Sequence, residues 1–513
     1  MQDSELVEIL NNQNTLLNET IASLNSTIID LRKQIEISTE TNLQNLEVIT
    51  SLNSKIEELT RKLQEAEDKL NKDSHNSSKP PSSDGLSKKN KKKDLSLRTR
   101  SGKKPGGQKG HTGKTLPTPQ KIDKLVTLYP LKCQNCPHLN QCKNKGICGT
   151  EQRYTMDIII ETRVVQYNAV EMKCMLENGK RIKGSFPKGV NSRLQYGENL
   201  SANIVTLSNC GLSCDSIHKV IGSTFGIPLS TGTIMNKLKA CAKKIAPVID
   251  DIKTRLTTSK IVHFDETGVR IDGKTRWTHS SSNKDFTYLT FNDKRGAIGI
   301  NDNGVLPLMN GGYAVHDCWK SYFKFKNVKH SICLQHIQRE LKGIFENHPE
   351  QTWSKSFFDF LIEMKNEKER LIALGIKNMD KSLLESYSTR FDRLLELGRR
   401  QNPPPKEIVK KRGRKRKGKS LSLIDRLNNY KDAALLFIYN FDVPFTNNMA
   451  ERSIRFLKIK AKVAGCFRSE EGADYYLNIR SYLDTARKQG KNIYQSIRQA
   501  FLDNPQYIFS PCL

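Results

Sequence analysis

The chain of 513 residues is long enough for several domains, and it carries 84 Lys and Arg against 54 Asp and Glu, a formal net charge of +30. This excess favours a polyanionic partner, either nucleic acid or an anionic membrane surface. The sequence has no run of 18 apolar residues and does not begin with the basic and apolar regions of a secretory signal. We therefore expect no membrane span and a cytoplasmic location.

Residues 1–72 carry a heptad repeat. With Val7 as position a, fifteen of nineteen a and d positions are apolar, mostly Ile at a and Leu at d, and the segment lacks Pro and Gly. A 3.5-residue period sustained this long predicts a coiled coil. Its composition favours a parallel homodimer, with Asn14 and Asn42 at a setting the register, although a higher oligomer stays open. A single helix packed on its own domain is the less favoured interpretation.

The composition changes abruptly at residues 73–120, which contain paired prolines, serine pairs and five glycines between Gly102 and Gly113. Such a segment cannot build a packed core and is predicted to be a flexible linker. Twelve Lys and Arg against two Asp lie between Lys79 and Lys114. We expect the segment both to separate the coiled coil from the rest and to lie along phosphates.

Residues 121–185 contain a cysteine cluster. Cys133 and Cys136 form a C-x-x-C pair, and Cys142 and Cys148 follow within a dozen residues. In a chain without a secretory signal, this spacing predicts a structural Zn²⁺ site with tetrahedral coordination. Free cysteines in a reducing cytosol are the alternative. Strand-like alternation at residues 157–160 and 163–165 predicts a small sheet beside this zinc-binding module.

Residues 186–255 have helical periodicity, with helices predicted at 199–207, 214–223 and 230–244 and Ser230 as the cap of the third. This order is typical of a helix-turn-helix, which would place the helix from Thr231 in a major groove. A helical layer packed on the neighbouring domain fits equally well, because no recognition face rich in Arg or Asn is evident.

Three short strands are predicted over residues 259–291. The first is apolar and stops at Asp265, and a later apolar strand over residues 312–315 ends at His316 and Asp317. A carboxylate at the end of a buried strand, followed by two antiparallel strands, is how a ribonuclease-H-like nuclease presents its first metal ligand. A lone Asp at this place would more simply cap a turn, so the prediction depends on the other carboxylates.

The third carboxylate, Glu451, lies on a predicted helix, where Arg455, Lys458 and Lys462 continue its face. Asp317 and Glu451 are 134 positions apart, so an inserted helical subdomain is predicted at about 346–440. Residues 406–419 within it hold nine Lys and Arg against one Glu and are predicted to bind DNA, with a solvated loop as the alternative.

Two Asp at strand ends and a Glu on a later helix are ligands suited to two Mg²⁺ ions in phosphoryl transfer. Spacing alone makes this a weak indication, but several blocks add to it: HFDETG, GYAVHDCWKSY, CLQHIQREL, NNMAERSIRFLKIKAKVAGCFRSEEGADYY and, upstream, NSSKPPSSDG and GKKPGGQKGHTG. In this order, from about Asn76 to Tyr482, the blocks resemble the insertion-sequence-66 family of DDE transposases.

The resemblance implies a multidomain α/β protein with a ribonuclease-H-like catalytic domain at residues 256–485 and a C-terminal helix and tail at 486–513. Asp265, Asp317 and Glu451 take the DDE positions and hold two Mg²⁺, for which Mn²⁺ could substitute. Many relatives have a second C-x-x-C where this chain has only Cys174, so the fourth zinc ligand is either Cys148 or Cys174.

The implied function is a transposase that binds insertion-sequence ends, cleaves them by metal-dependent hydrolysis and transfers the 3′ ends to target DNA. Whether accessory transposition proteins take part stays open. The alternative is a non-enzymatic, coiled-coil, zinc-containing DNA-binding regulator. His336 would orient a phosphate or water, with a core histidine as an equal alternative, and Arg339 would hold the DNA backbone. The residues predicted to contact DNA are His336, Arg339, Arg452, Arg455, Lys458, Lys462, Lys411, Arg412 and Arg414.

Overall fold

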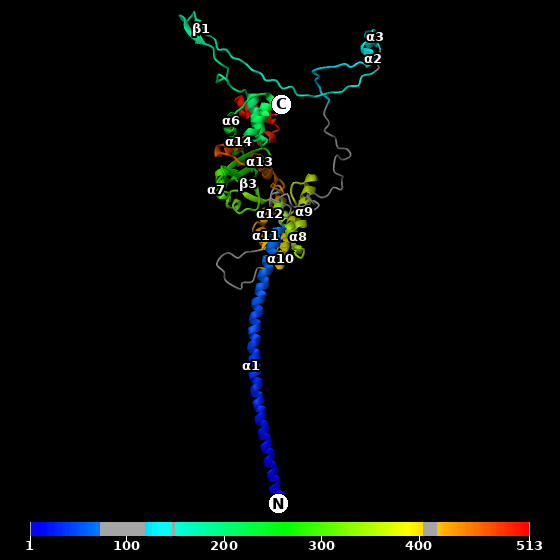
Figure 1. Cartoon of the computed structure of the whole chain (residues 1–513), viewed down its shortest axis with the longest axis vertical. Coiled ribbons are helices and arrows are strands. Elements are labelled where there is room, and N and C mark those ends of the chain that lie inside the picture. The colour runs from blue at the N-terminus through cyan, green and yellow to red at the C-terminus, as the bar shows by residue number, and fades with distance from the viewer. Residues whose placement is uncertain (1, 72–117, 146–148, 188, 404–417, 512–513) are drawn as a thin grey trace.

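A computed structural model of the chain describes residues 2–71, 118–145, 149–187, 189–403 and 418–511 (Figure 1). Almost all of the predicted linker, Cys148, and the basic residues Lys411, Arg412 and Arg414 lie outside these ranges. Among the described helices, none combines the length and apolar character needed to cross a membrane.

The N-terminal segment is one helix, α1 (Gln2–Leu70), of 69 residues. A helix of this length extends about 100 Å, and Figure 1 shows it projecting as a rod from the rest of the molecule. Apolar residues at the predicted a and d positions are solvent-exposed, as Ile28 and Leu31 illustrate. The prediction of a long helix is confirmed, and its pairing with a second copy stays a prediction.

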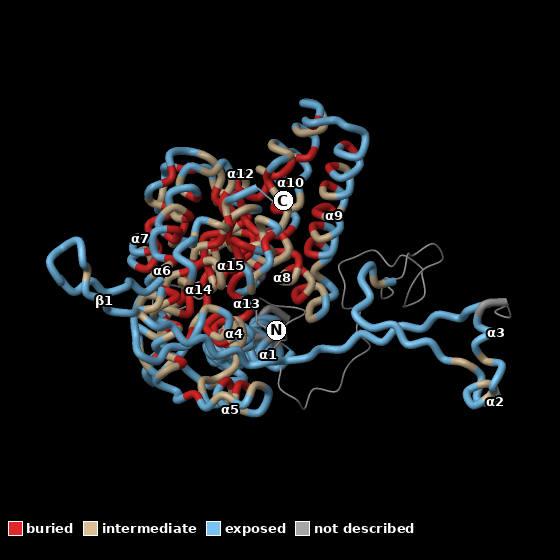
Figure 2. Tube along the Cα trace, turned by 90° about the horizontal axis from the view of Figure 1, so that it is seen from above, coloured by how far each residue is buried: buried red, intermediate tan, exposed pale blue. Residues whose placement is uncertain are grey.

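Residues 118–196 form few regular elements: α2 (Leu131–Gln134), α3 (Leu139–Lys145) and an antiparallel hairpin of β1 (Glu171–Cys174) and β2 (Lys180–Lys183). The strands predicted at 157–160 and 163–165 are wrong for the described chain, since residues 149–170 have no regular structure. Figure 2 shows this stretch as an exposed arm. The alternation fails to produce strands because no neighbouring strand is present to pair with the backbone.

Three helices precede the sheet: α4 (Glu198–Asn209), α5 (Cys214–Phe225) and α6 (Thr231–Thr257). Ser230 caps α6 as predicted, since its side chain accepts a hydrogen bond from the Thr233 N–H. α6 is much longer than predicted and buries apolar residues along its length, from Ile234 to Leu256. It packs mainly on α14 (Glu470–Lys488). The three helices thus form a layer packed on the neighbouring domain, as the second interpretation predicted. Binding of the α6 N-terminus in a DNA major groove stays a hypothesis.

The region after α6 is built on a mixed five-stranded sheet in the order β5-β4-β3-β6-β7. The strands are β3 (Ile261–Ile271), β4 (Lys274–Ser282), β5 (Thr287–Asn292), β6 (Tyr313–His316) and β7 (Lys329–Ile332). β3, β4 and β5 are antiparallel, whereas β6 and β7 run parallel to β3. The order and directions are consistent with a ribonuclease-H-like core.

The two faces of the sheet belong to different hydrophobic cores. Val262 and Ala314 pack with α4–α6, α7 (Ala297–Asn303) and the C-terminal helices. The next residue along β6, Val315, packs on the opposite face with the helices that follow the sheet. Because successive strand residues alternate faces, the odd-numbered residues of β3, including Asp265, share the face of Val315.

Among the described residues, five helices lie between β7 and the third carboxylate: α8 (Leu334–Asn347), α9 (Thr352–Ala373), α10 (Lys381–Gln401), α11 (Lys419–Asn429) and α12 (Lys431–Tyr439). The last four occupy the stretch predicted as a helical insertion, and they form one core around Trp353, Phe357 and Phe391. α12 also packs along the edge strand β7.

The remaining helices return to the sheet. α13 (Asn448–Ala464) crosses β3 and β4, and α14 covers the open edge of β5, where Ser481 and Thr485 hydroxyls accept the backbone N–H groups of Leu289 and Thr287. These bonds satisfy an edge that would otherwise be free. α15 (Ile493–Phe501) follows a turn at Gly490, which has a positive φ of 72° and separates α15 from α14.

Candidate active site

The parallel strands β6 and β7 end beside Asp265, which lies within β3. The prediction that the first strand stops at Asp265 is wrong, because β3 continues to Ile271 as the partner of β4. β3 and β6 pair with a constant offset of 52 residues, as in His263 opposite Val315, and this offset places Asp317 beside Asp265. The offset of 16 residues between β6 and β7 places Cys333 beside Asp317. Adjacent strands lie about 4.8 Å apart, so the three side chains leave the sheet at one level. The carboxyl ends of parallel strands are where open α/β sheets bind ligands.

Asn447 joins this edge to the helix that carries Glu451. Its buried side chain donates from Nδ2 to the Phe264 carbonyl at 2.7 Å, and its Oδ1 lies 2.9 Å from His263 Nδ1. Its backbone N–H donates to Cys333 Sγ at 3.2 Å. Asn447 is the N-cap residue of α13, but its side chain makes no capping bond because it is hydrogen-bonded to β3. Glu451 is thereby held one turn beyond the strand ends.

The carboxylates at this edge repel one another. Removal from water raises the pKa of Asp265 well above its ordinary value, and the charges of Glu266, Asp317 and Glu451 raise it further. Burial and the charge of Glu266 raise the pKa of Asp317 to about 6, although His336 lowers it. Acidic groups whose charges disfavour one another in this way are stabilised by a cation placed among them.

Glu266 is a carboxylate that the sequence analysis missed. Arg295 binds its Oε1 through Nη2 at 2.6 Å and Nε at 2.9 Å, and the Tyr322 hydroxyl donates to its Oε2. The Arg295 guanidinium lies over the rings of Trp277 and Trp319, 4.9 and 4.5 Å from their centroids. The sequence signal that could have identified Glu266 is its position directly after Asp265. Because successive residues of a strand point to opposite faces, the second carboxylate lies on the face that is packed against the core.

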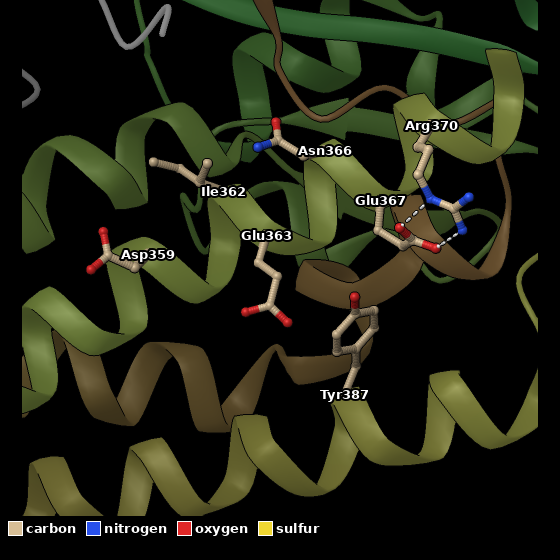
Figure 3. Close-up of a pocket in the computed structure, with 7 residues that line it drawn as sticks. All are labelled: Asp359, Ile362, Glu363, Asn366, Glu367, Arg370 and Tyr387. Carbon is tan, nitrogen blue, oxygen red and sulfur yellow. Dashed lines mark hydrogen bonds and ion pairs between the residues drawn. The ribbon is translucent and has the colours of Figure 1, made fainter.

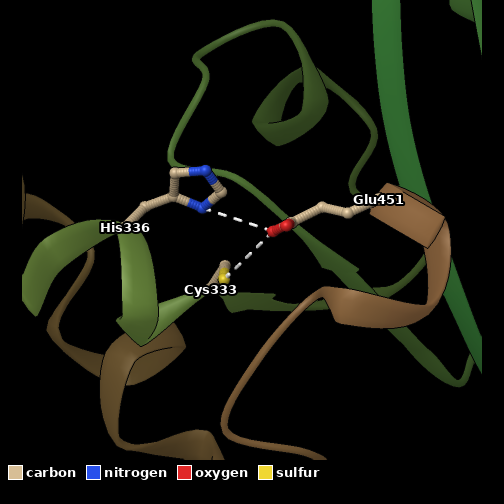
Figure 4. Close-up of side chains that lie close together, drawn as sticks. All are labelled: Cys333, His336 and Glu451. Atoms are coloured by element: carbon tan, nitrogen blue, oxygen red, sulfur yellow. Dashed lines mark hydrogen bonds and ion pairs between the residues drawn. The ribbon is translucent and has the colours of Figure 1, made fainter. Parts of the chain in front are cut away.

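A further group at this edge combines three chemistries (Figure 4). Glu451 Oε1 lies 4.0 Å from Cys333 Sγ and 3.8 Å from His336 Nδ1. Burial and the nearby Glu451 charge raise the pKa of the Cys333 thiol to about 12, against hydrogen bonds from backbone N–H groups, including that of Asn447. His336 is thus next to the candidate carboxylate, whereas the sequence analysis assigned no role to Cys333.

The cations predicted to contact DNA lie on two helices. Arg452, Arg455, Lys458 and Lys462 are exposed on α13, and Arg339 is half-buried on α8. Lys458 Nζ lies 3.4 Å from the Gly268 carbonyl, so this lysine reaches back to β3. The row begins one residue after Glu451 and continues along α13, which leaves positive side chains free to meet phosphates on one side of the carboxylate cluster.

The predicted zinc ligands are not gathered in the described chain. Cys133 and Cys136 are half-buried and Cys142 is exposed. Within the described residues, Cys333, His336 and Glu451 are the only three His, Cys, Asp or Glu side chains with ligand atoms within 4.8 Å of one another. Cys174 lies on the β1–β2 hairpin, which both views place away from α2 and α3. The zinc site stays a prediction.

A surface pocket of about 570 Å³ lies elsewhere, between α9 and α10 (Figure 3). Its acidic lining is already paired: Glu367 binds Arg370, and Glu363 binds Arg390. None of the residues proposed for the chemistry lines it. The candidate active site is therefore the cluster around Asp265, Asp317 and Glu451 and not this pocket.

Comparison with known proteins gives two findings. A family model described as "Transposase IS66 family" matches residues 193–475, more than half of the chain, and this range contains all three candidate carboxylates and the Cys333–His336 pair. A second model, described as a family of unknown function (DUF6444), matches residues 19–117. A search of curated proteins found no match.

Proposed function

The chain belongs to the IS66 family of transposases, and we propose from this that it binds the ends of an insertion sequence, cleaves them by metal-dependent hydrolysis and transfers the 3′ ends to target DNA. The observation that supports the proposal is the register of β3 and β6, which places Asp265 beside Asp317, together with the raised pKa of Asp265, to which burial and the charges of Glu266, Asp317 and Glu451 contribute. Family membership implies phosphoryl transfer on DNA, and this cluster is where it would occur.

The donor set fits a hard divalent cation. Asp265, Asp317 and Glu451 offer only carboxylate oxygens, the ligands that Mg²⁺ and Mn²⁺ prefer. Burial raises the pKa of both Asp, and the charges of nearby carboxylates raise both further, so a bound positive charge would favour their ionised forms. We propose that these three residues hold two Mg²⁺. When bound, such a pair activates the attacking oxygen and stabilises the leaving oxygen of the phosphodiester.

The protein's own groups then supply position and charge. Asn447 holds Glu451 against the end of β3, and the Arg295–Glu266 pair fixes the strand behind Asp265. The exposed cations of α13, together with Arg339, would align the DNA backbone with the scissile phosphate. Water is the nucleophile for cleavage, and the freed 3′-hydroxyl is the nucleophile for transfer. No covalent protein–DNA intermediate is required.

The N-terminal half would serve assembly and DNA capture. α1 presents an exposed heptad stripe suited to a parallel partner helix of a second copy. We propose that Cys133, Cys136 and Cys142, with Cys148 or Cys174, hold a structural Zn²⁺. The basic segments at 79–114 and 406–419 would add phosphate contacts, and any accessory transposition proteins would act on this assembly.

The test is cleavage of a labelled duplex carrying the element's terminal repeat, in Mg²⁺ or in EDTA, with wild type, Asp265→Asn and Glu451→Gln. We expect Mg²⁺-dependent cuts at the repeat boundary that fall at least about a thousandfold in both variants, with nearly unchanged DNA binding. Glu385→Gln, an exposed change on α10, is the matched control and should cut like wild type.

Two results would overturn the proposal. Cutting that survives Glu451→Gln would place the chemistry elsewhere in the chain. Tight binding of the repeat without cutting, in either Mg²⁺ or Mn²⁺, would favour a DNA-binding regulator over an enzyme.

A further inference from the structure

Three side chains from different elements converge at the rim of the candidate active site. Cys333 ends β7 and is the N-cap residue of α8, His336 lies on the first turn of that helix, and Glu451 lies on the first turn of α13. Their ligand atoms all lie within 4.8 Å of one another. Figure 4 shows the thiol and the imidazole both directed at the Glu451 carboxylate.

This donor set differs in kind from the all-carboxylate set next to it. Sulfur and imidazole nitrogen are poor ligands for Mg²⁺ but good ones for Zn²⁺, Cd²⁺ and Co²⁺. From the usual bond lengths, ligand atoms around a tetrahedral Zn²⁺ lie about 3.4–3.6 Å apart. The observed separations of 4.0 Å and 3.8 Å to Glu451 Oε1 therefore need to close by only a few tenths of an ångström.

The polar atoms of this group are only partly satisfied, since the thiol contacts Glu451 and a backbone N–H while the imidazole Nδ1 makes no hydrogen bond. His336 Nδ1 is buried and has no hydrogen-bond partner among the described residues. Cys333 Sγ is not packed among apolar atoms alone, since the Asn447 N–H donates to it at 3.2 Å. Backbone donors of this kind orient metal-bound thiolates and stabilise their charge. His336 Nδ1, which has no hydrogen-bond partner, and Cys333 Sγ, which accepts a backbone hydrogen bond, are therefore both suited to bind a soft cation.

Access to the group is one-sided. Cys333 is 1% exposed, whereas the side chains of His336 and Glu451 are 21% and 29% exposed. A cation would enter between the imidazole and the carboxylate, with the thiol as the floor of the site. One coordination position would stay open towards solvent, as in zinc sites that exchange a ligand.

We propose that Cys333, His336 and Glu451 form a binding site for a thiophilic divalent cation such as Zn²⁺, and that this site shares Glu451 with the hard-metal cluster of Asp265 and Asp317. The two kinds of cation then compete for one carboxylate. The consequence for cleavage rests on the proposed transposase function, whereas the binding itself does not. Occupation by the soft cation withdraws Glu451 from the Mg²⁺ ligand set and arrests the reaction.

The direct test is titration of the full chain with Cd²⁺, following the thiolate-to-cadmium charge-transfer band in the ultraviolet. Because other cysteines can also bind Cd²⁺, the quantity compared is the difference between wild type and Cys333→Ala. The matched control is Cys241→Ala, which removes an equally buried cysteine from α6. His336→Ala, at a half-exposed position, provides a second variant whose folding is less at risk.

We expect wild type and Cys241→Ala to bind one more tight Cd²⁺ equivalent, with more charge-transfer intensity, than Cys333→Ala. His336→Ala should keep the sulfur band but weaken that equivalent at least about tenfold, as loss of one metal-binding partner does. Equal stoichiometry and band intensity in wild type and Cys333→Ala would overturn the proposal, as would unchanged affinity in His336→Ala.

A cleavage arm separates this inference from the proposed function. In Mg²⁺, added Zn²⁺ should inhibit wild type at least about tenfold more strongly than it inhibits His336→Ala, each compared with its own rate without Zn²⁺. If Cys333→Ala binds one Cd²⁺ fewer than wild type but wild type never cuts DNA, the soft-metal site is upheld and the transposase proposal is rejected. Mg²⁺-dependent cutting with identical Cd²⁺ titrations would do the reverse.

Discussion

Two regions of this molecule carry similar apolar patterns with opposite outcomes. In the sheet, Val262 and Val315 are both fully buried, each beneath a different layer of helices. In the arm at residues 149–170, Ile158 and Val164 remain 83% and 89% exposed, and the apolar stripe of α1 is likewise in solvent. Figure 2 shows the contrast between the buried interior and the exposed arm.

The contrast separates what a pattern specifies from what completes it. Periodicity identifies which apolar side chains need to be buried, but it does not specify which other element or partner covers them. The sheet finds its layers in the same chain, in α6 and in α8–α13. α1 and the arm find none among the described residues, so we expect their layers to come from a second copy, a metal or DNA. Four predictions test this division, from the largest expected effect to the smallest.

The largest effect is expected on association through α1. Replacing Ile28 and Leu31 with Lys puts charges at adjacent a and d positions of a predicted dimer seam, where an unpaired charge is strongly disfavoured. The dissociation constant should rise at least about a thousandfold, measured by analytical ultracentrifugation. Changing Asn11 and Asn18, which lie outside a and d, to Lys is the control. An unchanged oligomeric state in the first variant would mean that α1 does not carry the interface.

A matched pair of isoleucines compares the two regions directly. Ile204→Ala on α4 empties a fully buried position and should cost about 2–5 kcal/mol of unfolding free energy. Ile158→Ala removes the same atoms from an exposed position and should change it by less than about 0.5 kcal/mol. Both changes in unfolding free energy are measured by denaturant unfolding at protein concentrations at which the chain is monomeric. Equal losses would show that the arm is packed in solution.

A smaller loss is expected from the clamp at the active site. Asn447→Ala leaves the Phe264 carbonyl and His263 Nδ1 without their partner, which should cost about 1–3 kcal/mol. It should also lower Mg²⁺-dependent cleavage more than DNA binding, because Glu451 loses its support. Asn236→Ala, at an exposed position of α6, should change neither quantity. Full activity in Asn447→Ala would show that α13 holds its place without the clamp.

The smallest effect concerns pH. The folded-state pKa of Asp317 is raised to about 6, above an unfolded value of about 3.9. The stability that this group contributes to the metal-free protein is therefore full below about pH 4 and is lost as pH rises through about 6. Asp317→Asn should remove this part of the pH dependence of unfolding, whereas Glu385→Gln should leave it. A pH dependence that is identical in Asp317→Asn and wild type would contradict the assignment.

Several features of the site were predictable because they depend on local pattern. The strand that carries Asp265, the strand that stops before Asp317 and the helix that begins before Glu451 each follow from runs of apolar residues and their breaks, although β3 continues to Ile271 and does not stop at Asp265 as predicted. The Ser230 cap and the length of α1 are local in the same sense. The order of the family blocks then indicated that the three carboxylates belong together.

Other features depended on contacts between distant segments. Glu266 was missed because its partner Arg295 lies beyond two further strands, so the local sequence shows only an acid next to another acid. Cys333 was missed because its thiol meets Glu451 from 118 positions away. The strands predicted at 157–160 and 163–165 failed for the converse reason, since their alternation had no partner strand in the described chain.

The sequence by itself determined which segments carry the core helices and strands and which carboxylates lie on or next to them, because backbone propensity and apolar periodicity act over a few residues. Only the tertiary structure decided that β6 and β7 end at the level of Asp265 in β3 and that Asn447 ties α13 to them. It also brought a thiol and an imidazole to the third carboxylate. Contacts across 100 residues or more, such as that between Cys333 and Glu451, are set by packing and hydrogen bonding between distant segments, which no local pattern encodes.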